Sequence, residues 1–175
     1  MADKITILLT EEEIDKRIAE LGAQITKEYE GKEITMVCIL KGATLFACEL
    51  AKRIDLPLEM EYMRCSSYGN ETESSGVVKI DLDLDRSIRN KHILVVEDII
   101  DTGRTMKYLL DILKGRGPAD VKLCSLLDKP DRRVTAVNID YTGFVIPDKF
   151  IVGYGLDYAQ KYRNLPYIGV VEPEV

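Results

Sequence analysis

Apolar and polar residues follow two different periods along the chain, which predict helices in some stretches and strands in others. Thr10 begins a capping-box pattern completed by Glu13, and apolar residues then recur at helical spacing from Ile14 to Ile25. This spacing predicts a first helix over residues 11–29.

Three runs are predominantly apolar, which is typical of strands buried on both faces. They are Ile34–Leu40, His92–Val96 and Asp120–Leu127. Helical stretches, residues 43–53 and Thr105–Lys114, follow the first two. Strands that alternate with helices predict an α/β fold with a mostly parallel sheet.

Shorter runs complete the expected set of strands. Val77–Leu84 alternates apolar and polar residues, which predicts a half-exposed strand. The polar stretch Ser66–Gly76 before it lacks periodicity, so we expect a mobile loop at the tip of a hairpin. The remaining strand predictions are Ile5–Leu9, Leu58–Cys65, Phe150–Tyr154 and Tyr167–Val171.

Length and charge narrow the class of protein. The 175 residues suit one domain, residues 1–175, at about 100–200 residues per domain. A net charge of −6 argues against a protein that coats nucleic acid, which needs a basic face. No apolar run is long enough to span a membrane, and the N-terminus lacks the core of a signal peptide. We expect a cytoplasmic protein with neither nucleic-acid nor membrane partners.

The cysteines and the single histidine do not form a metal-binding pattern. There are four cysteines, no CxxC pair and one histidine, so a zinc site is not expected. Cys38 and Cys124 lie in apolar runs and are predicted to be buried. His92, at the start of a strand, is expected to have a packing or surface role.

The segment Val95–Thr105 is the candidate ligand-binding segment, because it leads from a predicted strand through a loop into a helix. Ligands of open α/β sheets bind at the carboxyl ends of strands. Small residues, hydroxyl groups and backbone N–H groups at a helix start suit a phosphate. The residues of this loop are Asp101, Thr102, Gly103, Arg104 and Thr105.

Two carboxylates, Glu97 and Asp98, directly precede the loop, where they would repel a phosphate unless they had partners of their own. Magnesium bound to phosphate oxygens, or the hydroxyl groups of a sugar, would satisfy them. The alternative interpretation is a solvated acidic strand end.

This segment resembles the phosphoribosyl-pyrophosphate (PRPP) motif of type I phosphoribosyltransferases, and Glu-Asp-Ile-Ile-Asp-Thr-Gly is similar to its form in the hypoxanthine-guanine branch. Arg104 stands where some members have lysine. Other segments resemble that branch in the same order along the chain. They are Leu40-Lys41-Gly42 (pyrophosphate loop), Ser67-Tyr68 (closing loop), Lys129 (purine-selecting lysine), Ile146–Tyr158 (base-binding segment) and Arg163 (a late arginine that binds pyrophosphate).

The resemblance implies a type I phosphoribosyltransferase fold, in which helices flank a central, mostly parallel sheet and a small hood and a mobile hairpin loop complete the site. It implies Mg²⁺-dependent transfer of 5-phosphoribose from PRPP to N9 of hypoxanthine or guanine, which yields IMP or GMP and pyrophosphate. The transition state would resemble an oxocarbenium ion. This is a purine-salvage reaction, and the family forms homodimers or homotetramers.

Roles for the phosphate side follow from the same resemblance. Lys41, Gly42 and Arg163 would hold pyrophosphate, and the Asp101–Thr105 loop would hold the 5-phosphate. Glu97 and Asp98 would face ribose and magnesium. Asp157 would reach a second magnesium ion or the N2 side of the purine.

Roles for the purine side are also implied. Asp101 would act as general base near N7, although it also suits a helix N-cap. Lys129 would donate to the 6-oxo group and so reject adenine, although a lysine in Asp-Lys-Pro-Asp is commonly a solvated turn residue. Phe150 would stack on the purine, although it also suits a core strand. Ile151 would contribute backbone groups.

Two rivals share the expected fold. A regulatory RNA-binding protein would need a basic face, and the other rival is a xanthine-preferring relative, although Phe150 and the segment 146–150 resemble the hypoxanthine branch more. The sequence leaves open the preference between hypoxanthine and guanine, the acceptance of xanthine, dimer against tetramer, the slow step, and whether the Leu40–Lys41 peptide is cis.

Overall fold

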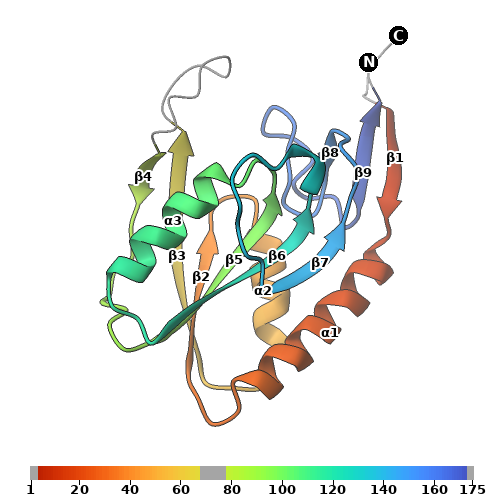
Figure 1. Ribbon diagram of the computed structural model, residues 1–175. Coiled ribbons are helices and arrows are strands. Elements are labelled where there is room, and N and C mark those ends of the chain that lie inside the picture. The colour runs from red at the N-terminus through yellow and green to blue at the C-terminus, as the bar shows by residue number, and fades with distance from the viewer. Residues whose placement is uncertain (1–3, 68–77, 173–175) are drawn as a thin grey trace.

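The computed structural model describes residues 4–67 and 78–172, and its centre is a six-stranded sheet with the order β4-β3-β2-β5-β6-β7 (Figure 1). All neighbouring strands of this sheet pair in parallel except β3 and β4, which are antiparallel. The predicted parallel sheet and the predicted hairpin are therefore confirmed. The strands are β2 (Ile34–Ile39), β3 (Leu58–Ser67), β4 (Val78–Leu82), β5 (His92–Ile100), β6 (Asp120–Asp128) and β7 (Tyr141–Val145).

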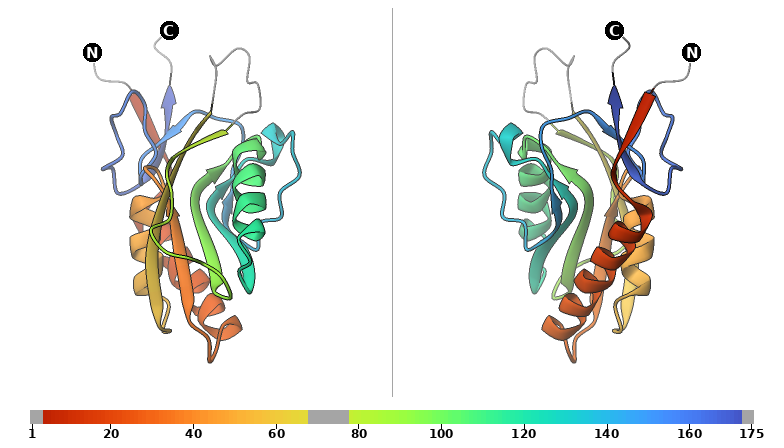
Figure 2. Two further views of the ribbon diagram at one scale, coloured as in Figure 1. Left: turned by 90° about the vertical axis from the view of Figure 1, so that its left-hand side faces the viewer. Right: turned by 90° about the vertical axis from the view of Figure 1, so that its right-hand side faces the viewer.

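A second sheet of three strands, in the order β1-β9-β8, lies beyond the carboxyl ends of the parallel strands (Figure 2). Its strands are β1 (Lys4–Leu9), β8 (Ile151–Val152) and β9 (Ile168–Glu172), and they pair antiparallel. This small sheet is the hood that the sequence predicts.

Helix α1 (Glu11–Glu28) begins at the predicted capping box. The Thr10 N–H donates to Glu13 Oε2 at 2.8 Å, and the Glu13 N–H donates to Thr10 Oγ1 at 3.2 Å. The apolar stripe of Ile14, Ile18 and Ile25 is fully buried. The local pattern thus sets both the start of the helix and the face that packs on the sheet.

Helices cover both faces of the large sheet. Helix α1 and helix α2 (Thr44–Lys52) pack on one face, and helix α3 (Arg104–Gly115) packs on the other (Figure 2). Two buried apolar clusters fill the two interfaces, so the central strands β2, β5 and β6 are buried on both sides. Among the described residues, no helix is long and apolar enough to cross a membrane.

Several elements differ from the sequence prediction, and three of the differences bear on the site. Strand β5 continues to Ile100, so Glu97 and Asp98 belong to the strand itself. Strand β7 was not predicted. Strand β8 stops at Val152, because Gly153, Tyr154 and Gly155 have φ angles of +96°, +49° and +98°, which no strand accommodates.

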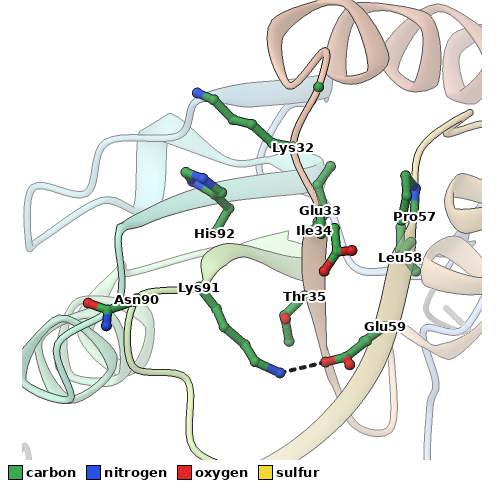
Figure 3. A pocket seen from close by; sticks show the side chains of 11 residues that line it. Lys32, Glu33, Ile34, Thr35, Pro57, Leu58, Glu59, Asn90, Lys91 and His92 are labelled. Atoms are coloured by element: carbon green, nitrogen blue, oxygen red, sulfur yellow. Dashed lines mark hydrogen bonds and ion pairs between the residues drawn. The ribbon is translucent and has the colours of Figure 1, made fainter.

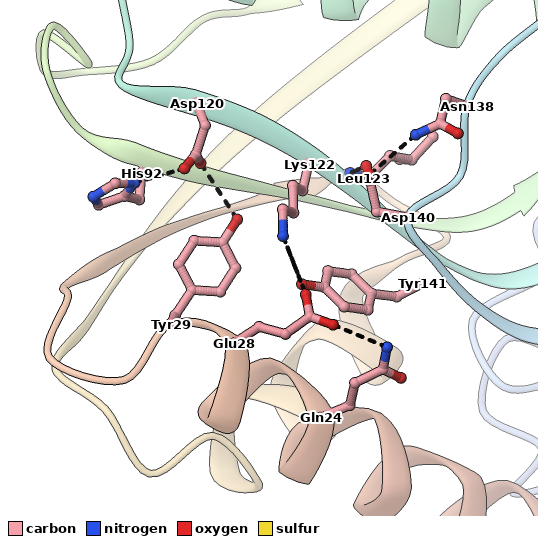
Figure 4. A network of polar contacts seen from close by, with 10 residues as sticks. All are labelled: Gln24, Glu28, Tyr29, His92, Asp120, Lys122, Leu123, Asn138, Asp140 and Tyr141. Carbon is pink, nitrogen blue, oxygen red and sulfur yellow. Dashed lines mark hydrogen bonds and ion pairs between the residues drawn. The ribbon is translucent and has the colours of Figure 1, made fainter.

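A polar network ties the end of α1 to the starts of β5 and β6 (Figure 4). His92 Nδ1 lies 2.7 Å from Asp120 Oδ2, and the Tyr29 hydroxyl donates to Asp120 Oδ1 at 3.3 Å. His92 therefore has the expected packing role. Cys38 and Cys124 are fully buried as predicted, and burial raises the pKa of the Cys38 thiol to about 12.

Candidate active site

The loops that follow β2, β5, β6 and β7 meet at one edge of the large sheet, because parallel strands end together. These loops bring Lys41, Asp101, Lys129 and Asp148 to the same side of the molecule. Glu97 and Asp98 lie in β5, whereas Ile151, Asp157 and Arg163 lie in β8 of the small sheet and in the segment that follows it.

Glu97 and Asp98 lie half-buried near the end of β5. The Asp98 N–H donates to Glu97 Oε1 at 3.0 Å, and the Ile99 N–H donates to Asp98 Oδ1 at 2.7 Å. Burial raises the pKa of both carboxyls, and the charge of Asp98 raises the pKa of Glu97 further. The pair thus requires positive charge nearby to stay ionised.

Two glycines let three segments of the site touch. A Cβ atom on Gly42 would lie 1.7 Å from Asp98 Oδ2, and a Cβ atom on Gly155 would lie 2.0 Å from the Gly42 carbonyl oxygen. The peptide bond between Leu40 and Lys41 is cis. The β2–α2 loop therefore lies between the acidic pair and the segment that follows β8.

The loop after β5 leads into α3, whose N-cap is Gly103 with a φ of +82° and no side-chain cap. The alternative role of Asp101 as N-cap is therefore wrong. The Arg104 N–H donates to Thr102 Oγ1 at 3.4 Å, and Thr105 lies exposed in the first turn of the helix. A cavity of about 220 Å³ opens beside Glu97, Asp101, Thr102, Gly103 and Thr105.

The segment after β6 packs against this loop through its backbone. The Lys129 N–H donates to the Ile100 carbonyl at 3.0 Å, and the Thr135 N–H donates to the Thr102 carbonyl at 3.0 Å. Arg133 Nε donates to the Asp101 carbonyl at 3.1 Å. The loop 101–105 is thus held from the side by residues 129–135.

Four side chains form a chain of ion pairs along this edge. Arg132 Nε lies 3.0 Å from Asp101 Oδ1, and Arg132 Nη1 lies 3.6 Å from Asp148 Oδ1. Asp148 Oδ1 in turn lies 3.7 Å from Lys129 Nζ. Arg132 and Asp148 were not singled out from the sequence, although both lie in segments that carry a predicted residue.

Lys129 and Asp101 each keep a polar atom without a hydrogen bond inside the described part of the chain. The Lys129 side chain is 9% exposed and its ammonium has only the distant Asp148 contact, so the interpretation as a solvated turn residue is wrong. Asp101 Oδ1 is buried, and its contact with Arg132 lacks the geometry of a hydrogen bond. The Lys129 ammonium and Asp101 Oδ1 therefore each have an ion pair but no hydrogen bond within the described residues.

Arg163 and Lys41 converge on the loop that contains Asp157. Arg163 donates to the Gly155 carbonyl at 2.7 Å and pairs with Asp157 Oδ1 at 2.8 Å. Lys41 Nζ contacts Gln160 Oε1 at 3.4 Å. Gln160, which sequence reasoning missed, thus links the two predicted pyrophosphate cations.

The remaining predicted residues are Phe150, Ile151, Ser67 and Tyr68. The Phe150 ring is 54% exposed and meets Tyr158 edge-on, with ring centroids 5.4 Å apart, so it is not a core residue. Ile151 is buried in β8. Ser66 and Ser67 belong to the end of β3, so the prediction that the loop begins at Ser66 is wrong, and Tyr68 and the rest of the predicted loop lie outside the described residues.

The acidic pair fits a magnesium ion that also binds substrate. The described residues contain no group of three or more metal-ligating side chains. Magnesium in phosphate sites is held by one or two carboxylates together with phosphate oxygens of the substrate. Glu97 and Asp98 can provide the carboxylates. Asp157 already accepts from the Gln160 N–H at 2.8 Å and pairs with Arg163, so it would have to exchange these partners.

A separate cavity of about 510 Å³ lies at the opposite edge of the sheet, where β2, β3 and β5 begin (Figure 3). Lys32, Glu33, Glu59, Lys91 and His92 line it, and none of them is a predicted site residue. The carboxyl edge remains the candidate active site.

A mostly parallel sheet flanked by helices, with a small second sheet beyond its carboxyl edge, is the fold expected of a type I phosphoribosyltransferase. The family model described as "Phosphoribosyl transferase domain" matches residues 5–159. The chain belongs to this family, and its relatives place it in the hypoxanthine-guanine branch, as predicted.

A hypoxanthine-guanine phosphoribosyltransferase from Lactococcus lactis is 53% identical over 169 residues, which cover 97% of this chain and 92% of the relative. A crystal structure of a hypoxanthine phosphoribosyltransferase from Staphylococcus aureus superposes with a TM-score of 0.93 at 49% identity, covering 96% of this chain and 91% of that one. The bifunctional protein TilS/HprT of Listeria innocua is 54% identical over 97% of this chain, which spans only 26% of that relative's length.

Proposed function

We propose that the chain transfers 5-phosphoribose from PRPP to N9 of hypoxanthine or guanine and releases pyrophosphate, with residues 1–175 acting as one phosphoribosyltransferase domain. The observation that carries this proposal is the buried Lys129 ammonium linked through Asp148 and Arg132 to an unsatisfied oxygen of Asp101. A 6-oxopurine offers a carbonyl acceptor to the first group and a ring proton to the second. The relatives, which are named as hypoxanthine or hypoxanthine-guanine phosphoribosyltransferases, support this substrate class.

The phosphate side of the site supports PRPP as the other substrate. Lys41 and Arg163 would receive pyrophosphate, and the N–H groups of the Asp101–Thr105 loop would receive the 5-phosphate. Glu97 and Asp98 would hold magnesium and face the ribose hydroxyl groups, and Asp157 would reach a second magnesium ion or the N2 side of the purine. Bound magnesium would neutralise charge that develops on the departing pyrophosphate.

The purine side supports proton transfer and stacking. Asp101 would accept a proton at N7 while N9 attacks, and its position outside the helix cap leaves its carboxylate available for this role. The exposed Phe150 ring offers a stacking surface beside the backbone of Ile151. Ser67 and Tyr68 would close over the site and exclude water from the oxocarbenium-like transition state.

We propose that small molecules are the partners of the site and that the protein forms a homodimer or a homotetramer. The net charge of −6 gives no support to the alternative of an RNA-binding regulator.

A coupled assay tests the proposal directly. The purified protein is mixed with PRPP, Mg²⁺ and hypoxanthine, guanine, xanthine or adenine, and pyrophosphate release is measured. We expect turnover with hypoxanthine or guanine and little with adenine. No turnover with either 6-oxopurine, or equal turnover with adenine, would refute the assignment.

A further inference from the structure

Arg132 and Asp148 occupy the middle of the ion-pair chain, and each contacts two groups of opposite charge. Arg132 lies between the carboxylates of Asp101 and Asp148, at 3.0 Å and 3.6 Å. Asp148 lies between Arg132 and Lys129, at 3.6 Å and 3.7 Å. Because a guanidinium is a rigid planar fork, its two contacts fix the distance between the carboxylates that it joins.

The chain of ion pairs joins three loops that the backbone already brings together. Arg132 ends the short helix η1 (Pro130–Arg132), which directly follows Lys129. The Lys129 N–H donates to the Ile100 carbonyl at 3.0 Å, and the Ile146 N–H donates to the Asp128 carbonyl at 2.9 Å. Small movements of these loops would therefore move Asp101 and Lys129, the two ends of the ion-pair chain, together.

Stability does not account for this arrangement. The side chains of Arg132 and Asp148 are 49% and 48% exposed, and half-exposed ion pairs contribute little to the free energy of unfolding. The ends of the chain, in contrast, are a nine-tenths-buried ammonium and a buried carboxylate oxygen that lacks a hydrogen bond. The geometry points to a role in the reaction.

We infer that Arg132 and Asp148 are positioning residues, which hold the proton acceptor Asp101 and the 6-oxo donor Lys129 in place relative to each other. The inference rests on the proposed function and adds to it. Arg132 acts on proton transfer through Asp101, and Asp148 acts on purine recognition through Lys129. Neither is required to touch the substrate.

The roles of Arg132 and Asp101 are tested by a double-mutant cycle. We expect Arg132→Gln to lower kcat with hypoxanthine about 10- to 100-fold, as displaced catalytic groups do, while the KM for PRPP stays unchanged. In an Asp101→Asn background, Arg132→Gln should lower kcat by less than about twofold, because its effect passes through Asp101. Arg132→Lys should restore part of the loss.

Asp148→Asn tests the other half of the ion-pair chain, and we expect it to change the KM for hypoxanthine and not mainly kcat. We expect the KM for hypoxanthine to rise and the preference for hypoxanthine over adenine to fall, with a smaller change in kcat. Arg86→Gln is the matched control, because Arg86 also pairs with a carboxylate, Glu59 at 3.9 Å, outside the candidate active site. It should leave all constants unchanged.

The outcomes separate this inference from the proposed function. An active parent protein whose Arg132→Gln variant keeps its kcat, or loses the same factor with and without Asp101, would overturn the positioning role. An inactive parent protein would refute the proposed function and the inference with it. Circular dichroism and PRPP titration confirm folding, and if Arg132→Gln does not fold, Arg132→Lys and Asp148→Asn decide the matter on the same constants.

Discussion

Gly42 and Asp98 approach so closely that a Cβ atom on residue 42 would lie 1.7 Å from Asp98 Oδ2. The other oxygen of this carboxylate accepts from the Ile99 N–H at 2.7 Å, so the group is anchored and would lose that hydrogen bond if it moved. The β2–α2 loop and the acidic pair therefore meet only because residue 42 has no side chain.

Gly42→Ala is expected to impair PRPP binding. The added methyl group must displace the Asp98 carboxylate, and a displacement of about 1 Å at a site can cost about 10²-fold in rate. We expect a rise in the KM for PRPP with a smaller change in the KM for hypoxanthine, measured by steady-state kinetics. Gly115→Ala is the control, since no atom lies within 4 Å of the added Cβ and its constants should match the parent. An unaltered KM for PRPP in Gly42→Ala would contradict the contact.

Glu97→Gln is expected to stabilise the ligand-free protein at neutral and higher pH. Burial and the charge of Asp98 raise the pKa of Glu97 above its ordinary value near 4.5, so the folded state binds more protons than the unfolded state above that pH. The free energy of unfolding therefore falls as pH rises through this window, and the amide removes this loss. Each 1 kcal/mol recovered raises Tm by about 2–4 °C for a chain of this size.

Thermal melts from pH 5 to pH 8 without Mg²⁺ or PRPP measure this difference. The gain in Tm for Glu97→Gln should grow with pH, whereas the exposed Glu30→Gln should give no such trend. If the gain in Tm instead shrinks toward pH 8, the pKa of Glu97 is not raised in the folded protein, and the repulsion between Glu97 and Asp98 is ruled out.

Asp101→Asn tests the general base. A positioned base contributes about 10²–10⁴-fold, and the amide cannot accept the purine proton, so kcat with hypoxanthine should fall by a factor in that range. Binding of PRPP, followed by calorimetry, should persist because the loop N–H groups remain. Asp111→Asn is the control, since Asp111 pairs with Lys107 on the exposed face of α3 and should keep kcat. A parental kcat in Asp101→Asn would eliminate the role.

The sequence predicts local features well and long-range contacts poorly, for physical reasons. The capping box at Thr10 and the buried strand β2 each depend on residues that are neighbours in the sequence, and both were predicted. Strand β7 was missed because Gly143, which a strand normally disfavours, is required where its Cα approaches the Leu126 carbonyl. The contact of Arg132 with Asp148 joins loops 16 positions apart and depends on the pairing of β6 with β7, which no local pattern reveals.

Lys129→Ala is expected to weaken discrimination between purines. The buried ammonium of the parent protein can donate to a 6-oxo group, and adenine would leave it unpaired at a cost of about 1–3 kcal/mol. Removal of the donor should lower the hypoxanthine-over-adenine ratio of kcat/KM by at least about tenfold. The exposed Lys27→Ala should keep the ratio. If the ratio in Lys129→Ala equals that of the parent, Lys129 does not read the 6-oxo group.

Magnesium is expected to bind tightly only together with PRPP. The described residues offer a pair of carboxylates and no third ligand beside them, and magnesium in phosphate sites takes its other ligands from phosphate oxygens and water. Calorimetric titration of the ligand-free protein with Mg²⁺ should therefore show weak binding, and titration in the presence of PRPP should show strong binding. Asp98→Asn should weaken the second titration, whereas Asp111→Asn should not. Tight binding of Mg²⁺ to the protein alone would show instead that the chain forms a complete metal site, and chelation would then lower the Tm of the ligand-free protein as well as its activity.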